Sequence, residues 1–200
     1  MYKNVYKNDA MKREEHMAVR NTAGWYLWTH ELVEVEGPDA AALLEYLFTG
    51  SIGNLAPSRA RYTTMLNENG QIIDDVVIWC MGENKYWVST LYAKRMIPWF
   101  AKHKGEKEVE FKNITKQWDM YAVQGPKSKD ILNEMLDNPV DDQKFFQILD
   151  NAIDGVPVKV NRGGFTGEKW GYEVYIAPEH TKLVVEKLRQ IAPKYDAKQV

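Results

Sequence analysis

A chain of 200 residues with 44% hydrophobic side chains can bury a proper core, either in one large domain or in two small, closely associated ones. Its net charge of −2 gives no electrostatic case for a nucleic-acid partner, and the single cysteine, Cys80, excludes an intramolecular disulfide, as suits a reducing cytosol. No apolar run approaches the ~20 residues that a membrane helix needs, and the charged N-terminus lacks a signal-peptide core. These features predict a soluble, cytoplasmic protein that binds neither a membrane nor nucleic acid.

The first predicted elements form one half of the chain. A short amphipathic helix covers residues 10–21, and an aromatic run follows at residues 25–30. The stretch VEGPDA at residues 35–40 ends a strand and opens a helix, because proline is tolerated in the first turn, where its missing N–H would be unpaired anyway. Three strand-like runs and a second helix complete this half, near residues 59–66, 71–79, 85–90 and 92–103.

The second half repeats this order of elements. The stretch VQGPKS at residues 123–128 again ends a strand and opens an apolar-periodic helix. Further strands and a final helix follow near residues 145–150, 156–161, 172–176 and 178–191, and the tail after Ile191 is expected to be weakly anchored. The predicted fold class is therefore α+β, with two pseudo-repeated β-α-β-β-β-α halves of mixed, mostly antiparallel sheet. A polar, glycine-containing linker places the predicted boundary between residues 1–104 and 105–200.

The segment at residues 62–79 carries the most specific chemical signal. Asn69-Gly70 between two apolar runs predicts a tight hairpin turn, since both residues tolerate positive φ. Asp74 and Asp75 lie next to each other on the second strand, whose apolar flanks predict burial on both faces. A buried carboxylate is costly unless it is paired, hydrogen-bonded or functional. The pair therefore either caps a bulge or faces an arginine, or one member holds a nitrogen of a polar heterocycle.

Two other segments are candidate ligand sites. The glycine-rich stretch 162–173 places Trp170 near Glu173. It forms either a structured turn or a receptor for an aminopteridine-like ring, with an aromatic face beside a carboxylate that accepts in-plane N–H donors. The aromatic run 25–30 ends in His30, which is either simply packed or a general acid or base. The histidine and cysteine spacing supports no metal site, and no phosphate-binding loop or nucleophile elbow is present.

Taken in order, these segments resemble the folate-binding aminomethyltransferases, the family that includes the glycine-cleavage T-protein and the tetrahydrofolate-dependent demethylases. The most specific matches are LNENGQIIDDVV at residues 66–77 and YAVQGPKSKDIL at residues 121–132. REEHMAVRNTAGWY, VEGPDA and GFTGE…GYE add to them and extend the match over nearly the whole chain. The resemblance implies a tetrahydrofolate site in the centre of the fold and the transfer of a methyl or aminomethyl unit from a small-molecule donor.

The resemblance also implies roles for particular residues. Asp75 matches the second aspartate of the family's Ile-Ile-Asp-Asp strand, which lies near the reactive folate nitrogens and assists one-carbon transfer. Glu173 would hold the donor edge of the pterin, and Tyr62 matches a folate-lining position. The expected site is completed by the cofactor-binding Phe165 and Trp170, the catalytic His30, and the donor-facing Tyr26, Trp28 and Glu31.

Some positions depart from the T-protein pattern. Phe165 stands where the T-protein usually has tyrosine, and Leu91 where it usually has asparagine, so the demethylase branch is favoured over strict glycine cleavage. Family enzymes normally continue into a further β-rich domain, which this chain is expected to lack. It would then be a fragment, a natural short form or a subunit that a second protein chain completes. The alternative function is a non-catalytic folate-binding or assembly subunit, and a structural role without folate also stays open.

Overall fold

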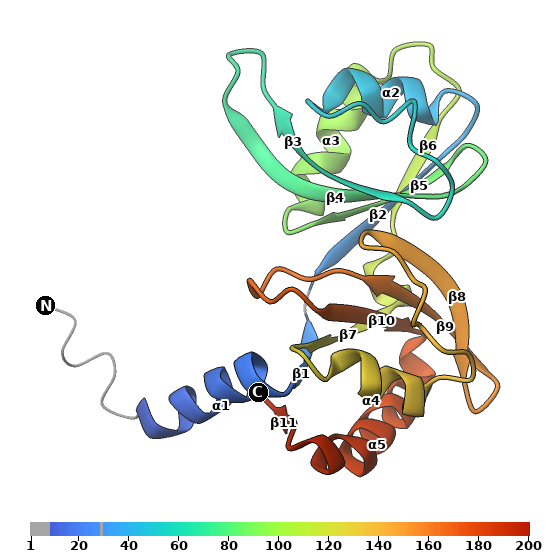
Figure 1. Cartoon of the computed structure of the whole chain (residues 1–200). Helices are drawn as coiled ribbons and strands as arrows, with labels where there is room; N and C mark the ends of the chain where they lie inside the picture. The colour runs from blue at the N-terminus through green and yellow to red at the C-terminus, as the bar shows by residue number, and fades with distance from the viewer. Residues whose placement is uncertain (1–8, 29) are drawn as a thin grey trace, which may run out of the picture. The chain divides into compact units, whose positions relative to one another are not determined.

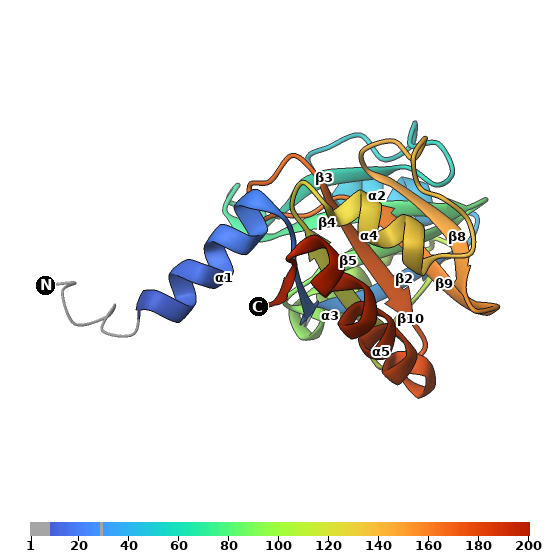
Figure 2. The ribbon, with the colours of Figure 1, turned by 60° about the horizontal axis from the view of Figure 1, so that its bottom comes forward.

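The computed structural model describes the chain except for residues 1–8 and 29, and the described residues form two compact units (Figures 1 and 2). Unit 1 consists of residues 9–28, 119–145 and 150–200, and unit 2 of residues 30–118 and 146–149. Both are α+β units with largely antiparallel sheets, so the predicted fold class is confirmed.

Unit 1 contains a six-stranded sheet in the order β11-β1-β7-β10-β9-β8. Its strands are β1 (Gly24–Trp28), β7 (Asp119–Gln124), β8 (Gln147–Ile153), β9 (Val156–Arg162), β10 (Gly171–Ile176) and β11 (Lys198–Gln199), and only the first residues of β8, up to Leu149, belong to unit 2. Its helices are α1 (Asp9–Asn21), α4 (Ser128–Met135) and α5 (Thr181–Ile191), with 3-10 turns η2 (Pro178–His180) and η3 (Ala192–Tyr195). Tyr172, Val174 and Ile176 of β10 pack with Leu132 of α4 and Leu188 of α5, so these helices cover one face of the sheet.

Unit 2 contains a five-stranded antiparallel sheet in the order β3-β4-β5-β2-β6. Its strands are β2 (Glu31–Glu36), β3 (Ala60–Leu66), β4 (Ile72–Gly82), β5 (Lys85–Thr90) and β6 (Glu110–Asn113). Two helices, α2 (Ala40–Leu47) and α3 (Ala93–Lys104), and the 3-10 turn η1 (Thr115–Gln117) complete the unit. The alanine- and leucine-rich α2 buries Leu43, Leu44 and Leu47, which pack with Ile78 of β4 and Phe100 of α3.

The two Gly-Pro sequences perform the same task in the two units. Gly37 and Gly125 both have positive φ, at 139° and 126°, and the helices α2 and α4 begin a few residues after them. A Cβ at Gly37 would lie 2.5 Å from the Glu108 carbonyl oxygen, and a Cβ at Gly125 would lie 2.5 Å from that of Val19. Both positions therefore require glycine, because the backbone turns sharply and approaches another segment.

The pairing of the strands corrects two expectations. The predicted division at residue 104 differs from the observed units, because β6 pairs with β2 and keeps the chain in unit 2 up to residue 118. The tail after Ile191 is well anchored rather than loose. Lys198 and Gln199 of β11 pair in parallel with β1, and the Val200 N–H donates to the Trp25 carbonyl at 3.1 Å.

The burial of β4 differs from the expected pattern at its first residues. Val76 and Ile78 point into the α2–α3 core, as predicted. Asp75, however, is exposed, because the core of unit 2 covers only the alternate face of the strand here. Ile72 is also exposed, since the pairing of β4 with β3 shifts register between Asp74 and Ile72, and simple alternation does not hold across this shift. The expected burial on both faces is therefore wrong for this part of β4, and of the two aspartates only Asp74 is buried.

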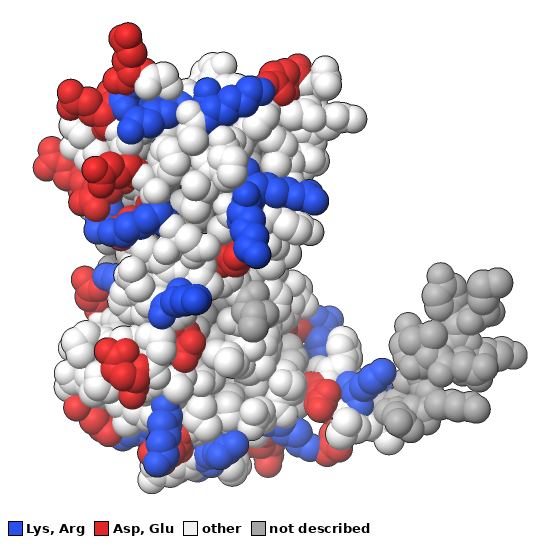
Figure 3. Space-filling model, turned by 180° about the vertical axis from the view of Figure 1, so that it is seen from behind, with Lys and Arg blue, Asp and Glu red and all other residues white. Residues whose placement is uncertain are grey.

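Charges of both signs are interspersed on the face drawn in Figure 3, in keeping with the small net charge of −2. None of the helices in residues 9–28 and 30–200 is long and apolar enough to cross a membrane.

Deleting a core side chain of unit 2 should cost far more stability than deleting an exposed one of the same type. Leu44→Ala should lower the free energy of unfolding by about 2–5 kcal/mol, because Leu44 is fully buried and its removal leaves a cavity. Leu91→Ala removes the same atoms from a side chain that is 54% exposed and should change stability little. Urea unfolding followed by tryptophan fluorescence measures both; equal losses would contradict the described core.

Candidate functional site

A row of directly paired residues crosses the sheet of unit 1. Tyr26 of β1 lies opposite Ala122 of β7, Ala122 opposite Glu173 of β10, and Glu173 opposite Asn161 of β9. Side chains alternate along a strand, and Tyr172 packs into the α4–α5 core. The row with Glu173 therefore lies on the other face of the sheet.

Glu173 is a buried carboxylate whose two oxygens differ in their hydrogen bonds. Its side chain is 7% exposed. The Asn161 amide donates to Oε2 at 2.9 Å and the Tyr175 hydroxyl donates to the same oxygen at 3.2 Å. No described residue donates a hydrogen bond to Oε1. Burial raises the pKa of the Glu173 carboxyl, and the two donors offset this only in part.

A cavity of about 140 Å³ lies over this carboxylate. Ala122 keeps the space beside Glu173 free of a large side chain, and the rings of Tyr26 and Trp28, with centroids 5.7 Å apart, contribute aromatic surface. Burial and the nearby charge of Glu173 raise the pKa of the Tyr26 hydroxyl. The remaining lining residues are Gln124, Gly164, Phe165 and Thr166. Aromatic rings around a carboxylate that can accept a further hydrogen bond suit a flat ligand with N–H groups at its edge.

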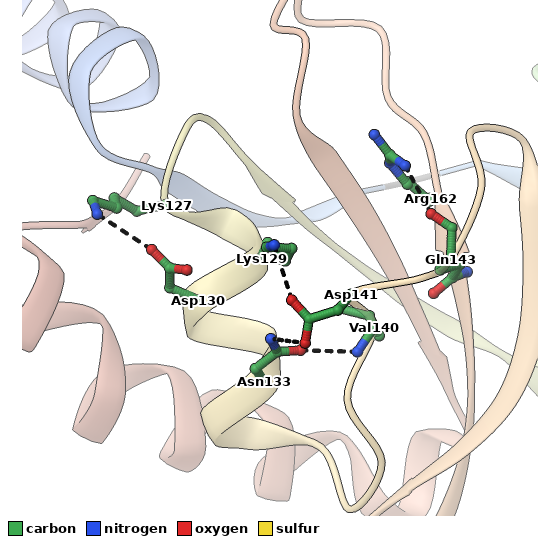
Figure 4. Close-up of polar contacts among 8 residues, drawn as sticks. All are labelled: Lys127, Lys129, Asp130, Asn133, Val140, Asp141, Gln143 and Arg162. Atoms are coloured by element: carbon green, nitrogen blue, oxygen red, sulfur yellow. Dashed lines mark hydrogen bonds and ion pairs between the residues drawn. The ribbon is translucent and has the colours of Figure 1, made fainter.

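Trp170, expected in the same site, is not among the residues that line this cavity. The Arg162 guanidinium lies 4.3 Å from the centroid of its ring and the Lys129 ammonium 5.9 Å from it. Both cations have further partners (Figure 4): Arg162 donates to the Gln143 carbonyl at 2.7 Å, and Lys129 forms an ion pair with Asp141 at 2.9 Å. The indole ring is thus part of a cation–π cluster beside α4.

In unit 2, the two neighbouring aspartates occupy different environments. Asp74 is 5% exposed, and burial raises the pKa of its carboxyl. The Thr90 hydroxyl donates to its Oδ2, and the Asp75 N–H donates to its Oδ1 at 3.0 Å. Thr90 in turn accepts a hydrogen bond from the Tyr92 N–H at 2.9 Å. Asp74 therefore joins β4 to the end of β5, where α3 is about to begin.

Asp75 is the exposed member of the pair. The Tyr62 hydroxyl donates to its Oδ2 at 2.7 Å, which raises the pKa of Tyr62. The contact follows from the register, because Asp75 lies opposite Thr64 and Tyr62 is the next residue of β3 on the same face. Asp75 and Tyr62 were expected to share a site, and the structure brings them together.

His30 and Glu31 precede and open β2. The His30 ring contacts the Ser89 hydroxyl through Nδ1, and burial lowers the pKa of the imidazole more than the negative charge of Asp75 raises it. The lowered pKa favours the neutral form of the His30 imidazole. Glu31, expected to face a methyl donor, accepts a hydrogen bond from the Ala93 N–H at 2.8 Å and so stabilises the first turn of α3.

Several residues that line the cavity of unit 1 or contact Glu173 or Asp74 were not predicted from the sequence. Gln124 is a polar residue at the end of an apolar strand, and this polarity is the one sequence feature that could have indicated a role for it. The other residues of this kind are Ala122, Asn161, Tyr175 and Thr90, whose contacts depend on strand register.

The two aspartates should respond differently to substitution. Asp74→Ala should lower the free energy of unfolding by about 1–3 kcal/mol, because it leaves a buried hydroxyl and a backbone N–H without an acceptor. Asp75→Ala should leave the free energy of unfolding nearly unchanged, since its carboxylate is exposed. Urea unfolding of both variants checks this, and a larger loss for Asp75→Ala would refute the assigned environments.

The buried carboxyl of Glu173 should make stability depend on pH. Its pKa in the folded protein is raised above the usual value of 4.5, so the folded state binds more protons than the unfolded state between 4.5 and the raised pKa. The free energy of unfolding should therefore fall as pH rises through this window. Glu173→Gln should weaken this slope, while the similar contribution of Asp74 remains in both proteins. Thermal unfolding from pH 4 to 8 measures the difference, and parallel curves would argue against a raised pKa.

Comparison with known proteins gives a consistent picture. The chain is 36% identical over 172 residues to an aminomethyltransferase of Streptomyces coelicolor, covering 84% of this chain and 46% of the relative. Its fold matches the glycine cleavage system aminomethyltransferase T from Bartonella henselae with a TM-score of 0.78 and 25% identity, over 88% of this chain and 47% of that one. The chain thus spans about half the length of these relatives.

A chain of similar length shares the fold. It belongs to a heterotetrameric sarcosine oxidase from Corynebacterium sp., which matches with a TM-score of 0.68 and 10% identity over 94% of both chains. The sequence profile described as the GCVT N-terminal domain matches residues 2–200. The predicted resemblance is confirmed, and the chain belongs to the GCVT N-terminal domain family.

Proposed function

We propose that this chain supplies the folate-binding part of a tetrahydrofolate-dependent one-carbon transferase. The observation that carries the proposal is the buried Glu173, whose Oε1 receives no hydrogen bond from the described residues and which lines a cavity with aromatic rings. The membership in the GCVT N-terminal domain family and the similarity to two aminomethyltransferases support the same activity class.

The residues present fit the pterin part of tetrahydrofolate. Glu173 can accept in-plane N–H donors through Oε1, and Tyr26, Trp28 and Phe165 can contact the faces of a flat ring. A volume of about 140 Å³ is smaller than the roughly 300–1,000 Å³ of most small-molecule pockets, so this cavity would hold one ring system rather than a whole ligand. When bound, tetrahydrofolate supplies a nitrogen that accepts the one-carbon unit.

Within unit 2, we assign the catalytic role to Asp75. Its exposed carboxylate is held by the Tyr62 hydroxyl at 2.7 Å and can orient a ligand nitrogen or hold its proton. His30, on whose imidazole the charge of Asp75 acts, would be the second titratable group beside the ligand. Most of the rate enhancement would come from holding two small reactants in a productive orientation.

We further propose which kind of molecule donates the one-carbon unit. Phe165 lines the cavity with a ring that has no hydroxyl, next to Tyr26 and Trp28. Where the bound pterin leaves these rings uncovered, they would offer the methyl donor an aromatic, weakly polar surface, which favours a methoxyarene or another methylated small molecule over a strictly glycine-derived aminomethyl donor. The activity would then be that of a demethylase.

A second candidate function is a non-catalytic folate-binding or assembly subunit. The observation that favours it is the chain of similar length and fold in a heterotetrameric sarcosine oxidase. In this case, a partner protein chain would complete the active enzyme, while Glu173 would still bind the pterin.

Calorimetric titration with tetrahydrofolate tests the proposal. The wild-type chain should bind with micromolar affinity, and Glu173→Gln should weaken binding roughly 10- to 100-fold, because an N–H donor loses its charged acceptor. Glu179→Gln, a change at an exposed glutamate of the same unit, should leave the affinity unaltered. Asp75→Asn should retain binding but reduce methyl transfer roughly 100-fold or more.

The outcomes also separate the two candidates. Binding without transfer to any donor would favour the subunit function, and transfer that appears only with an added partner chain would establish it. A folded wild-type chain that binds no tetrahydrofolate, alone or with the partner, would refute both.

A further inference from the structure

We infer that Gln124 is a positioning residue, which holds the glycine-rich loop of residues 163–171 against the ligand cavity of unit 1. The loop geometry is independent of the ligand; only the identity of the ligand rests on the function proposed above. Gln124 is the last residue of β7 and is 1% exposed. A buried amide needs partners for both its donor and its acceptor, and here all of them come from the loop and from the strand that follows it.

The amide of Gln124 joins three points around the loop. Its Nε2 donates to the Gly163 carbonyl at 3.0 Å and to the Tyr172 carbonyl at 3.2 Å, one at the start of the loop and one just after its end. Its Oε1 accepts a hydrogen bond from the Thr166 hydroxyl at 3.3 Å, in the middle of the loop. Next to it, the Gly125 N–H donates to the Trp170 carbonyl at 2.9 Å. The Gly163 N–H also donates to the Gly171 carbonyl at 3.0 Å, so the backbone joins the two ends of the loop and the Gln124 amide links both ends to its centre.

Two glycines make room for this amide. A Cβ at Gly164 would lie 2.0 Å from the Gln124 Oε1, and a Cβ at Gly171 would lie 2.2 Å from the same atom. Gly167, in the same loop, has no atom within 4 Å of such a Cβ. Positive φ alone therefore explains Gly167. Gly164 combines positive φ with the close approach of the amide, whereas Gly171 is required by the close approach alone.

The same amide connects the loop to the cavity. Gln124 lines the cavity together with Phe165 and Thr166, which the loop contributes. Because Thr166 is hydrogen-bonded to Gln124, the position of this wall depends on the amide. Gln124 would thus act on the ligand through the loop, by keeping Phe165 in place as one wall of a cavity that must fit a flat ring.

Matched glycine substitutions test this role without any ligand. Gly164→Ala and Gly167→Ala both place an alanine at positive φ, but only Gly164→Ala pushes against Gln124. Hydrogen–deuterium exchange of peptides covering residues 163–171 should be accelerated about tenfold more by Gly164→Ala than by Gly167→Ala. Peptides from α4 and α5 report whether either variant loosens the whole unit.

A double-mutant cycle then tests the coupling. In Gln124→Ala the loop should exchange faster, and adding Gly164→Ala should accelerate it clearly less than in the wild-type chain, because the clashing amide is gone and only the strain of positive φ remains. A residue with a merely structural role would instead give additive effects and would accelerate exchange in α4 and α5 as much as in the loop. Equal effects of the two glycine substitutions, or an additive cycle, would overturn the inference.

A binding measurement with 5-formyltetrahydrofolate as the probe tests whether the loop positions the ligand. If the wild-type chain binds it, Gly164→Ala should weaken binding about tenfold and Gly167→Ala much less, with unchanged exchange in α4 and α5. Equal affinities of all variants would show that the wall does not position the ligand and would overturn this part. If the wild type does not bind, the proposed function fails, while the exchange experiment still decides the role of Gln124.

Discussion

The buried carboxylate of Glu173 is the constraint on which the organisation of unit 1 depends. Burial disfavours its charge, so its neighbours on that face have to donate hydrogen bonds or leave room for a donor. Asn161 and Tyr175 donate to one oxygen, while the small Ala122 leaves space beside the carboxylate. The α4–α5 core lies on the opposite face, where Tyr172 and the other alternate residues of β10 pack, while Tyr175 is buried on the same face as Glu173. One face of β10 thus packs against the helices, and the other carries the buried carboxylate and its hydrogen-bond donors.

The repeated Gly-Pro connection lets two similar frameworks present different chemistry. In each unit, a strand turns at a glycine of positive φ and leads into a helix that covers the core. Unit 1 places a carboxylate in the middle of its sheet, where burial raises the pKa. Unit 2 buries Asp74 as a structural link and leaves Asp75 exposed beside Tyr62. The repeated order of elements therefore determines the fold, and the residues at alternating positions determine what each sheet can bind.

Patterns of neighbouring residues predict the long strands and helices well. They fail for short strands that pair with segments distant in the sequence. The strands and helices around the hairpin at Asn69-Gly70 follow from alternation and turn chemistry, and their observed bounds agree within a few residues. The short strands β6 and β11 carry no such signal. Their partners are β2 and β1, which are distant in sequence, so neither the unit boundary nor the anchored tail could be predicted.

The candidate site was predictable as a list of motifs but not as an arrangement. The roles of Asp75 and Glu173 stem from the family resemblance, and they stay predictions. Alternation shows that neighbouring aspartates face opposite ways, yet it does not say which face the core covers, and the buried one is Asp74. Gln124 illustrates the same limit, because a glutamine in an apolar strand signals an unusual environment without naming its partners. Those partners are set by the register of β7 against β10, which brings Gln124 opposite Gly171 and leaves no room there for any larger residue.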